Sequence, residues 1–140
     1  MKINRGASAN WKGTGKEGVG TISTQSTILD NAQLSFNTRF ANGVGTNPEE
    51  LVGAALAGCM TMKFSFVLNS MGFTADNIDS AVKVTLDTDL GKISVITVDI
   101  TASVPNINEE EFQKAAKETK ENCMISQLYK CEIEVNAVLV

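Results

Sequence analysis

The sequence has 140 residues, of which 43% are hydrophobic and 20% charged, and this composition is ordinary for one globular domain spanning residues 1–140. The net charge of -4 and the scattered placement of the 12 Lys and Arg residues argue against nucleic acid as a partner. The first residues lead into Gly, Ser and Asn instead of an apolar segment, so no secretory signal is expected. Together with an odd count of three cysteines, this favours a reducing, cytoplasmic location.

The first quarter of the chain is predicted to form a small antiparallel sheet. Short strands are expected at residues 7–11, 19–25 and 33–37, with glycine-containing turns between them. The glycine-rich stretch GTGKEGVG at residues 13–20 lacks the GK[ST] of a phosphate-binding loop. We therefore do not expect nucleotide binding.

A long helix is the clearest local prediction. Asn47 is a good N-cap, Pro48 suits the first helical position, and Glu50 completes a pattern like a capping box. The helix should run to about Met71, where Gly72 ends it.

The stretch from Leu51 to Met71 contains a single charged residue, Lys63, and is long enough to cross a membrane. A lysine near the bilayer centre costs roughly 2.5–3.5 kcal/mol on insertion scales, and the stretch also holds several polar residues, so no membrane span is expected. A helix this apolar must still be covered, and a chain of this size offers limited cover. We expect it to support dimerisation.

The rest of the chain predicts a second hairpin and further helices. Strands are expected at residues 78–86 and 93–104, joined by a turn at 87–91. A helix then begins near residue 108 and frays near Asn122, and its buried face is predicted to hold Phe112, Ala115, Ala116 and Thr119. A helical segment at 124–129 and a strand at 132–140 follow. This order predicts an α+β fold with two antiparallel sheet regions around a long central helix and no parallel βαβ crossover.

The cysteines are the main candidates for chemistry. Cys59 lies in the apolar helix, and Cys123 follows a charged stretch. The sequence has no histidine, so a reactive thiolate must be stabilised by a cation, a helix dipole or backbone donors. The candidate cations are Arg39, one of only two arginines, and Lys63, which lies one helical turn after Cys59. Three cysteines without histidine fall short of the four ligands of structural zinc, so neither a metal nor another cofactor is expected.

Four segments resemble the OsmC/Ohr family of organic hydroperoxide peroxidases, and most closely its OsmC branch. They are FNTRF at residues 36–40, GTNPEEL at 45–51, AALAGC at 54–59 and CMISQ at 123–127. The resemblance covers essentially the whole chain. It implies an intertwined homodimer that reduces organic hydroperoxides to alcohols at sites between the subunits.

The resemblance also implies roles for particular residues. Cys59 corresponds to the peroxidatic thiol and Cys123 to the resolving thiol, while Arg39 corresponds to an activating arginine and Glu49 to the glutamate that positions it. The family's disulfide is reduced by an external dithiol such as a lipoyl group. The sequence departs from the family in having Met124 where proline usually follows the second cysteine, in having Leu56 where the OsmC branch commonly has histidine, and in having Cys131.

A guanidinium such as that of Arg39 could stabilise the Cys59 thiolate. Lowering a cysteine pKa from about 8.5 to about 6 takes roughly 3.4 kcal/mol of thiolate stabilisation, which one close guanidinium could supply. Glu49 lies ten residues before Cys59 in the sequence, about 15 Å along one helix, so its effect must be indirect. We expect an Arg39–Glu49 pair of one subunit to serve Cys59 of its partner.

Other interpretations remain open. Cys59 could instead be a small buried hydrophobe of the core, and Glu49 a first-turn acid that only stabilises the helix dipole. Cys131 is either a core residue or a rival resolving thiol. Cys123 could instead be a half-exposed free thiol at a helix end. The protein as a whole could be a redox sensor, or a dimer that binds a lipid-like ligand, without peroxidase turnover. Alkyl groups of a substrate would be contacted by Phe36, Phe40, Leu56, Met60 and Met124.

Overall fold

The computed structural model describes residues 1–140, which divide into two compact units, residues 1–51 and 52–140. Both units combine strands with helical segments, and the predicted α+β class is confirmed. The boundary between the units falls near the start of the long helix. The expectation that residues 1–140 form a single domain stays a prediction.

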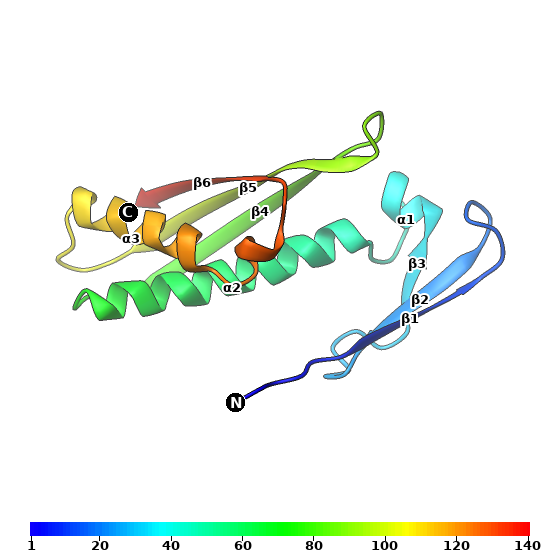
Figure 1. The fold of residues 1–140 in the computed structure, drawn as a ribbon, viewed down its shortest axis with the longest axis horizontal. Helices are drawn as coiled ribbons and strands as arrows, with labels where there is room; N and C mark the ends of the chain where they lie inside the picture. Colours follow the sequence, from blue (N-terminus) through cyan, green and yellow to red (C-terminus); the bar gives the residue numbers. More distant parts are fainter. The chain divides into compact units, whose positions relative to one another are not determined.

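The N-terminal unit contains a three-stranded antiparallel sheet (Figure 1). Its strands are β1 (Ala7–Lys12), β2 (Val19–Thr24) and β3 (Ala32–Ser35), arranged in the order β1-β2-β3. All three predicted strands are present, with ends within two residues of the predicted ones. The meander follows from the turns between successive short strands.

A short helix, α1 (Phe36–Phe40), follows β3 where the sequence predicted that the strand would continue to residue 37. The side chain of Ser35 accepts a hydrogen bond from the Thr38 N–H, and the Thr38 hydroxyl accepts one from the Ser35 N–H. This reciprocal pair is a capping box, which starts a helix at that point. The strand prediction was wrong at this point because apolar residues such as Phe36 and Phe40 fit a short strand and a short helix equally well.

The long helix is α2 (Pro48–Ser70). The side chain of Asn47 accepts a hydrogen bond from the Glu50 N–H at 2.8 Å, as expected of an N-cap. Gly72, with a φ of 88°, ends the helix. The Phe73 N–H donates to the Leu68 carbonyl, as in the Schellman motif of a glycine-capped helix. By length and composition alone, α2 could cross a membrane, as could the core helix of many globular proteins.

The C-terminal unit is built on the sheet order β4-β5-β6. Its elements after α2 are β4 (Asn77–Asp87), β5 (Lys92–Ser103), α3 (Glu109–Asn122), the single 3-10 turn η1 (Ser126–Leu128) and β6 (Glu132–Leu139). β4 and β5 form the predicted antiparallel hairpin.

β6, however, pairs with β5 in parallel, so the prediction that no parallel crossover occurs was wrong. A parallel partner needs a crossover of a dozen or more residues, and α3 provides it by running back along the sheet. The second sheet is therefore mixed.

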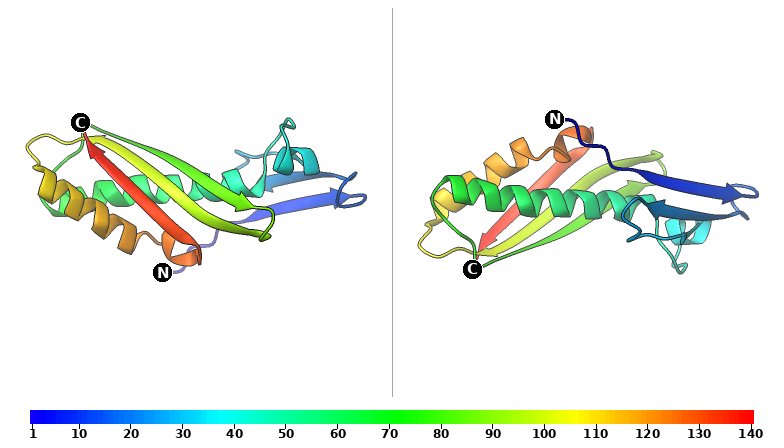
Figure 2. Two further views of the ribbon diagram at one scale, coloured as in Figure 1. Left: turned by 90° about the horizontal axis from the view of Figure 1, so that it is seen from above. Right: turned by 90° about the horizontal axis from the view of Figure 1, so that it is seen from below.

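Both α2 and α3 cover one face of this sheet (Figure 2). The predicted inner face of α3 is confirmed, because Phe112, Ala115, Ala116 and Thr119 are all buried. Phe64 of α2 meets Phe112 edge to face, with ring centroids 5.4 Å apart. The core is completed by α2 and β5 side chains, which include Leu56, Met60, Leu68, Ile96, Val98 and Ile100.

Candidate active site

Two cysteine sulfurs meet in the C-terminal unit. The Sγ atoms of Cys59, on α2, and Cys123, at the end of α3, lie 2.7 Å apart across 64 positions of sequence. Both thiols are free, and their separation exceeds the ~2.05 Å of a disulfide. The structure thus brings together the two cysteines for which the family resemblance implies a shared chemistry. Their catalytic roles remain predictions.

Cys123 is held in place by the way α3 ends. It is the C-cap residue, with an extended backbone (φ -72°, ψ 118°), and it is fully buried. The hydroxyl of Ser126 donates to the carbonyls of Cys123 and Lys120, at 2.8 and 2.9 Å, and so closes the turn onto the last turn of α3. The thiol therefore points inward, and Cys123 is not the half-exposed helix-end thiol that the sequence left open.

Tyr129 is a residue of the site that sequence reasoning missed. Its hydroxyl donates to the carbonyl of Val52 at 3.2 Å, which links the segment after η1 to α2. Burial raises the pKa of Tyr129, and the nearby Cys123, Cys131 and Cys59 raise it further because a phenolate beside thiolates is unfavourable. A lone tyrosine in the sequence carries no signal of this contact, since it spans 77 positions.

The pKa of Cys59 is raised in the single chain, which is the opposite of the direction expected from sequence. Burial is the largest cause, and the neighbouring Cys123 thiol adds to it, first through the hydrogen bond between the two thiols and then through the repulsion that two thiolates in contact would feel. The backbone N–H groups of Ile125 and Met124 act in the other direction and favour the thiolate. Lys63, the rival cation of the sequence analysis, is not among the groups that shift this pKa.

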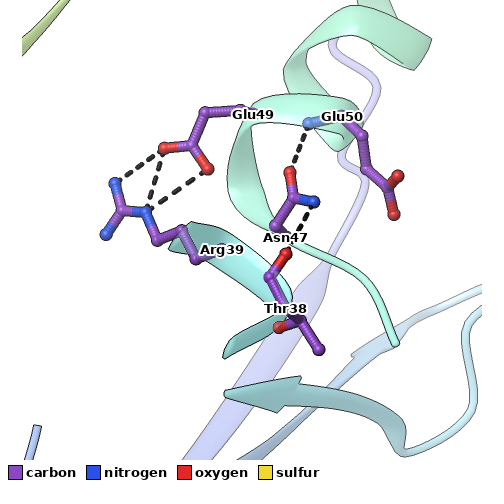
Figure 3. Close-up of polar contacts among 5 residues, drawn as sticks. All are labelled: Thr38, Arg39, Asn47, Glu49 and Glu50. Atoms are coloured by element: carbon purple, nitrogen blue, oxygen red, sulfur yellow. Dashed lines mark hydrogen bonds and ion pairs between the residues drawn. The ribbon is translucent and has the colours of Figure 1, made fainter. Parts of the chain in front are cut away.

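Arg39 and Glu49 form an ion pair in the N-terminal unit (Figure 3). Arg39 donates from Nε to both carboxylate oxygens, at 3.0 and 3.3 Å, and from its terminal NH2 group at 2.8 Å. Glu49 is largely buried, whereas Arg39 keeps 42% of its side chain exposed. The carboxylate thus fixes the plane of a guanidinium that still faces outward. The side chain of Asn47 donates to the Thr38 carbonyl at 3.1 Å and ties α1 to the start of α2.

Glu50 does not complete the capping box that the sequence predicted. Its side chain instead accepts a hydrogen bond from the Thr46 hydroxyl at 2.6 Å. The N-cap at Asn47 and the helix start at Pro48 are confirmed.

The predicted substrate contacts separate into two groups. Leu56 and Met60 are completely buried in the core, so the prediction that they contact a substrate was wrong. Phe36 and Phe40 are partly exposed, with their rings 4.7 Å apart, and the Arg39 guanidinium lies 5.1 Å from the Phe40 ring centre. Met124 is exposed.

Cys131 is half-buried and packs against the core. It lines a small surface cavity of about 340 Å³ together with Tyr129 and Glu132. No hydrogen bond joins it to either of the other two thiols.

One face of α2 carries apolar side chains that nothing else in the C-terminal unit covers. Ala55, Met62 and Phe66 follow one another at helical spacing, with Cys59 between them, and Met62 and Phe66 are 64% and 65% exposed. Exposed apolar residues gathered on one helix face mark an interaction surface more often than a free one. The half-buried Cys59 therefore lies beside a surface that is suited to a partner.

The fold and the pair of thiols define an α+β protein that has Cys59 on the long helix α2 and Cys123 at the end of α3, the helix that links the two parallel strands. Residues 41–138 match the family model described as OsmC-like protein, and the chain belongs to this family. A curated relative, Peroxiredoxin OsmC of Escherichia coli strain K12, is 41% identical over 138 residues, which cover 97% of this chain and 96% of that protein.

More distant relatives agree with this assignment. Organic hydroperoxide resistance protein-like 1 of Staphylococcus epidermidis is 29% identical over 99 residues, or 69% of this chain and 70% of that protein. Among solved structures, an OsmC-like protein from Mycoplasma pneumoniae is similar with a TM-score of 0.77 at 16% identity, covering 100% of this chain and 99% of that one. The organic hydroperoxide resistance protein OhrB of Bacillus subtilis gives 0.65 at 23% identity, with 96% and 98% covered. These structural matches support the fold.

Proposed function

We propose that this protein is a thiol peroxidase that reduces organic hydroperoxides to alcohols. The observation that carries the proposal is the 2.7 Å contact between the sulfurs of Cys59 and Cys123, with Cys59 half-buried on a helix and Cys123 fully buried behind it. A nucleophile that is reachable and a second thiol already in contact with it are what a two-cysteine peroxidase cycle needs. The relatives named for peroxiredoxin and hydroperoxide resistance support the same chemistry.

The cycle balances with these two thiols and an external reductant. The Cys59 thiolate attacks one peroxide oxygen, the O–O bond breaks, and the alkoxide takes a proton and leaves as the alcohol. Cys59 is then a sulfenic acid. Cys123 attacks its sulfur and displaces water, which forms the disulfide. A dithiol such as a lipoyl group then supplies two electrons and two protons, restoring both thiols while it becomes a disulfide itself.

The proposal also includes a source of positive charge. Because burial raises the pKa of Cys59 in the single chain, the reactive state needs a stabilising cation. We propose that Arg39, whose plane is fixed by Glu49, supplies it to Cys59 of a partner subunit. The guanidinium would also stabilise the alkoxide as it leaves.

A homodimer is part of the same proposal. The exposed apolar face of α2 carries Ala55, Met62 and Phe66, and a second copy of the helix would cover it. Such a dimer would place an apolar wall beside Cys59 and favour alkyl hydroperoxides over hydrogen peroxide.

The test is the reaction of the reduced protein with one equivalent of cumene hydroperoxide, followed by peptide mapping. We expect one equivalent of cumyl alcohol and a Cys59–Cys123 disulfide. Cys131→Ser is the matched control, and it should behave as the unmodified protein does, whereas Cys59→Ser should leave the hydroperoxide intact.

Turnover separates the alternatives. With dihydrolipoamide as reductant, a peroxidase consumes many equivalents of hydroperoxide. A single equivalent consumed without further cycles would indicate a redox sensor. Free thiols that persist in the presence of the hydroperoxide would contradict both and favour a binding protein.

A further inference from the structure

The turn after α3 has two backbone donors that no oxygen of the chain accepts. Later N–H groups of the segment are used, since that of Gln127 donates to the Cys123 carbonyl and that of Leu128 to the Ile125 carbonyl. The N–H groups of Met124 and Ile125 donate to no oxygen of the chain. Two neighbouring free donors in a turn suit an anionic acceptor.

The position of this turn is fixed by contacts on both sides of it. Before it, the Cys123 sulfur touches that of Cys59, and after it the Tyr129 hydroxyl bonds to the Val52 carbonyl. Val52 and Cys59 are seven residues apart on α2, which is two helical turns, so both anchors lie on one face of the helix. The backbone between these anchors is therefore held against the Cys59 sulfur.

Met124 contributes to this arrangement through its backbone. Its side chain is 77% exposed and so packs little against the rest of the protein. Any residue except proline would supply the same N–H. The identity of residue 124 matters to the site because it retains a donor.

We propose that the N–H groups of Met124 and Ile125 form a pair of donors that holds the Cys59 thiolate before it attacks peroxide. Both donors directly follow Cys123, whose sulfur contacts that of Cys59. On ionisation the sulfur becomes a much stronger acceptor, and both donors turn onto it. The value of this to turnover rests on the proposed peroxidase function, but the donor pair itself does not.

The groups that surround Cys59 fit this proposal. The two N–H groups lower its pKa, against burial and Cys123, which raise it. The titratable groups around it are Cys123 and Tyr129 from the segment after α3 and Lys63 on α2, with Cys131 beyond Tyr129. The donor pair is the component of this environment that favours the anion within the single chain.

Met124→Pro removes one donor, and Met124→Ala is the matched control that removes the side chain and keeps the N–H. Proline is compatible with the backbone, because Cys123 already has the extended conformation required before it.

The reduced proteins are alkylated with iodoacetamide from pH 6 to 10, and the Cys59 peptide is quantified by mass spectrometry. In the proline variant the inflection of the curve of Cys59 alkylation rate against pH should move to higher pH. The alkylation rate at pH 7 should fall about threefold, because the smaller thiolate fraction is partly offset by the greater nucleophilicity of a more basic thiolate. The alanine variant should match the unmodified protein.

Equal profiles for the proline and alanine variants would overturn the proposal. If the proline variant does not fold, amide NMR of the unmodified protein decides instead. The N–H signals of Met124 and Ile125 should move downfield as Cys59 ionises, and they should not move in Cys59→Ser. Signals that do not respond to the ionisation of Cys59 would also overturn the proposal. Neither measurement uses a hydroperoxide, so a shifted titration without turnover would retain the donor pair and refute only the peroxidase.

Discussion

The Tyr129 hydroxyl donates to the Val52 carbonyl on α2, and through this bond the last irregular segment of the chain is fastened to the helix that carries Cys59. The bond closes the segment between Cys123 and β6 over α2. We expect this bond to restrain the segment that presents the Cys123 thiol to Cys59. We expect Tyr129→Phe to lower the free energy of unfolding by about 1 kcal/mol, the usual effect of losing one such bond.

The same variant should form the Cys59–Cys123 disulfide more slowly, because the segment that carries Cys123 is less restrained. Stopped-flow mixing of the reduced protein with cumene hydroperoxide, followed through tryptophan fluorescence or acid quenching, measures the rate. Sulfenic acid trapping by dimedone should rise in parallel. An unchanged rate of disulfide formation would mean that α3 and Ser126 alone position Cys123.

The stability of the reduced protein should decrease as the pH is raised. Burial raises the pKa of Cys59, so above the ordinary thiol value of about 8.5 the folded state binds more protons than the unfolded state. The resulting stabilisation is fully present below that pH and is lost as the pH rises through the folded value. Tyr129, whose pKa is also raised, adds a loss of the same sign above about pH 10.

Urea unfolding between pH 7 and 10.5, under a reducing agent, measures this dependence. The oxidised protein is the control, since a Cys59 sulfur in a disulfide has no proton to lose. The reduced and oxidised proteins should therefore differ in slope above pH 8.5. Parallel curves would contradict the assigned direction of the Cys59 shift.

Asn47 makes two separable contributions at the start of α2. Its side-chain oxygen caps the helix, and its side-chain nitrogen bonds to the Thr38 carbonyl. Asn47→Ala removes both and should cost about 1 kcal/mol or more. Asn47→Asp keeps the cap and loses only the bond to Thr38, so it should cost less in urea unfolding. An equal loss in the two variants would assign the whole effect to the Thr38 contact.

Arg39→Lys tests the fork between Arg39 and Glu49. Lysine keeps the charge but cannot make the two-nitrogen contact with the carboxylate. If Arg39 activates Cys59, kcat/KM for cumene hydroperoxide should fall about tenfold and the inflection of the pH–rate profile should rise. Arg5→Lys changes the only other arginine and should leave both quantities unchanged. Equal kinetics in the two variants would remove Arg39 from the mechanism.

Phe66→Asp places a charge on the exposed apolar face of α2. If that face is the dimer interface, the variant should sediment as a monomer at concentrations where the unmodified protein is a dimer, because an unpaired charge would be buried. Phe66→Leu keeps an apolar side chain and should remain dimeric. A dimer that survives the aspartate would place the interface elsewhere.

The start and end of α2 were predictable because their signals are local. Asn47 and Pro48 lie within one helical turn, and Gly72 alone supplies the left-handed residue that ends the helix. The inner face of α3 was predictable for the same reason, since its residues repeat at helical spacing.

What could not be predicted depends on contacts distant in sequence. The direction of β6 is set by where α3 returns the chain, which the strand's own residues do not encode. The Tyr129–Val52 bond and the contact of the Cys59 sulfur with Cys123 depend on the tertiary fold. Leu56 and Met60 were misassigned because α2 is apolar on nearly all sides, so its sequence does not indicate which face packs against the sheet.

The long crossover through α3 also has a consequence for protein synthesis. Cys59 leaves the ribosome 64 residues before Cys123, and β6 must follow before the second sheet is complete. During translation, the nascent chain exposes the Cys59 thiol before Cys123 has been made. If Cys123 captures oxidised Cys59 as proposed, we expect newly synthesised molecules to be more vulnerable to irreversible oxidation than mature ones.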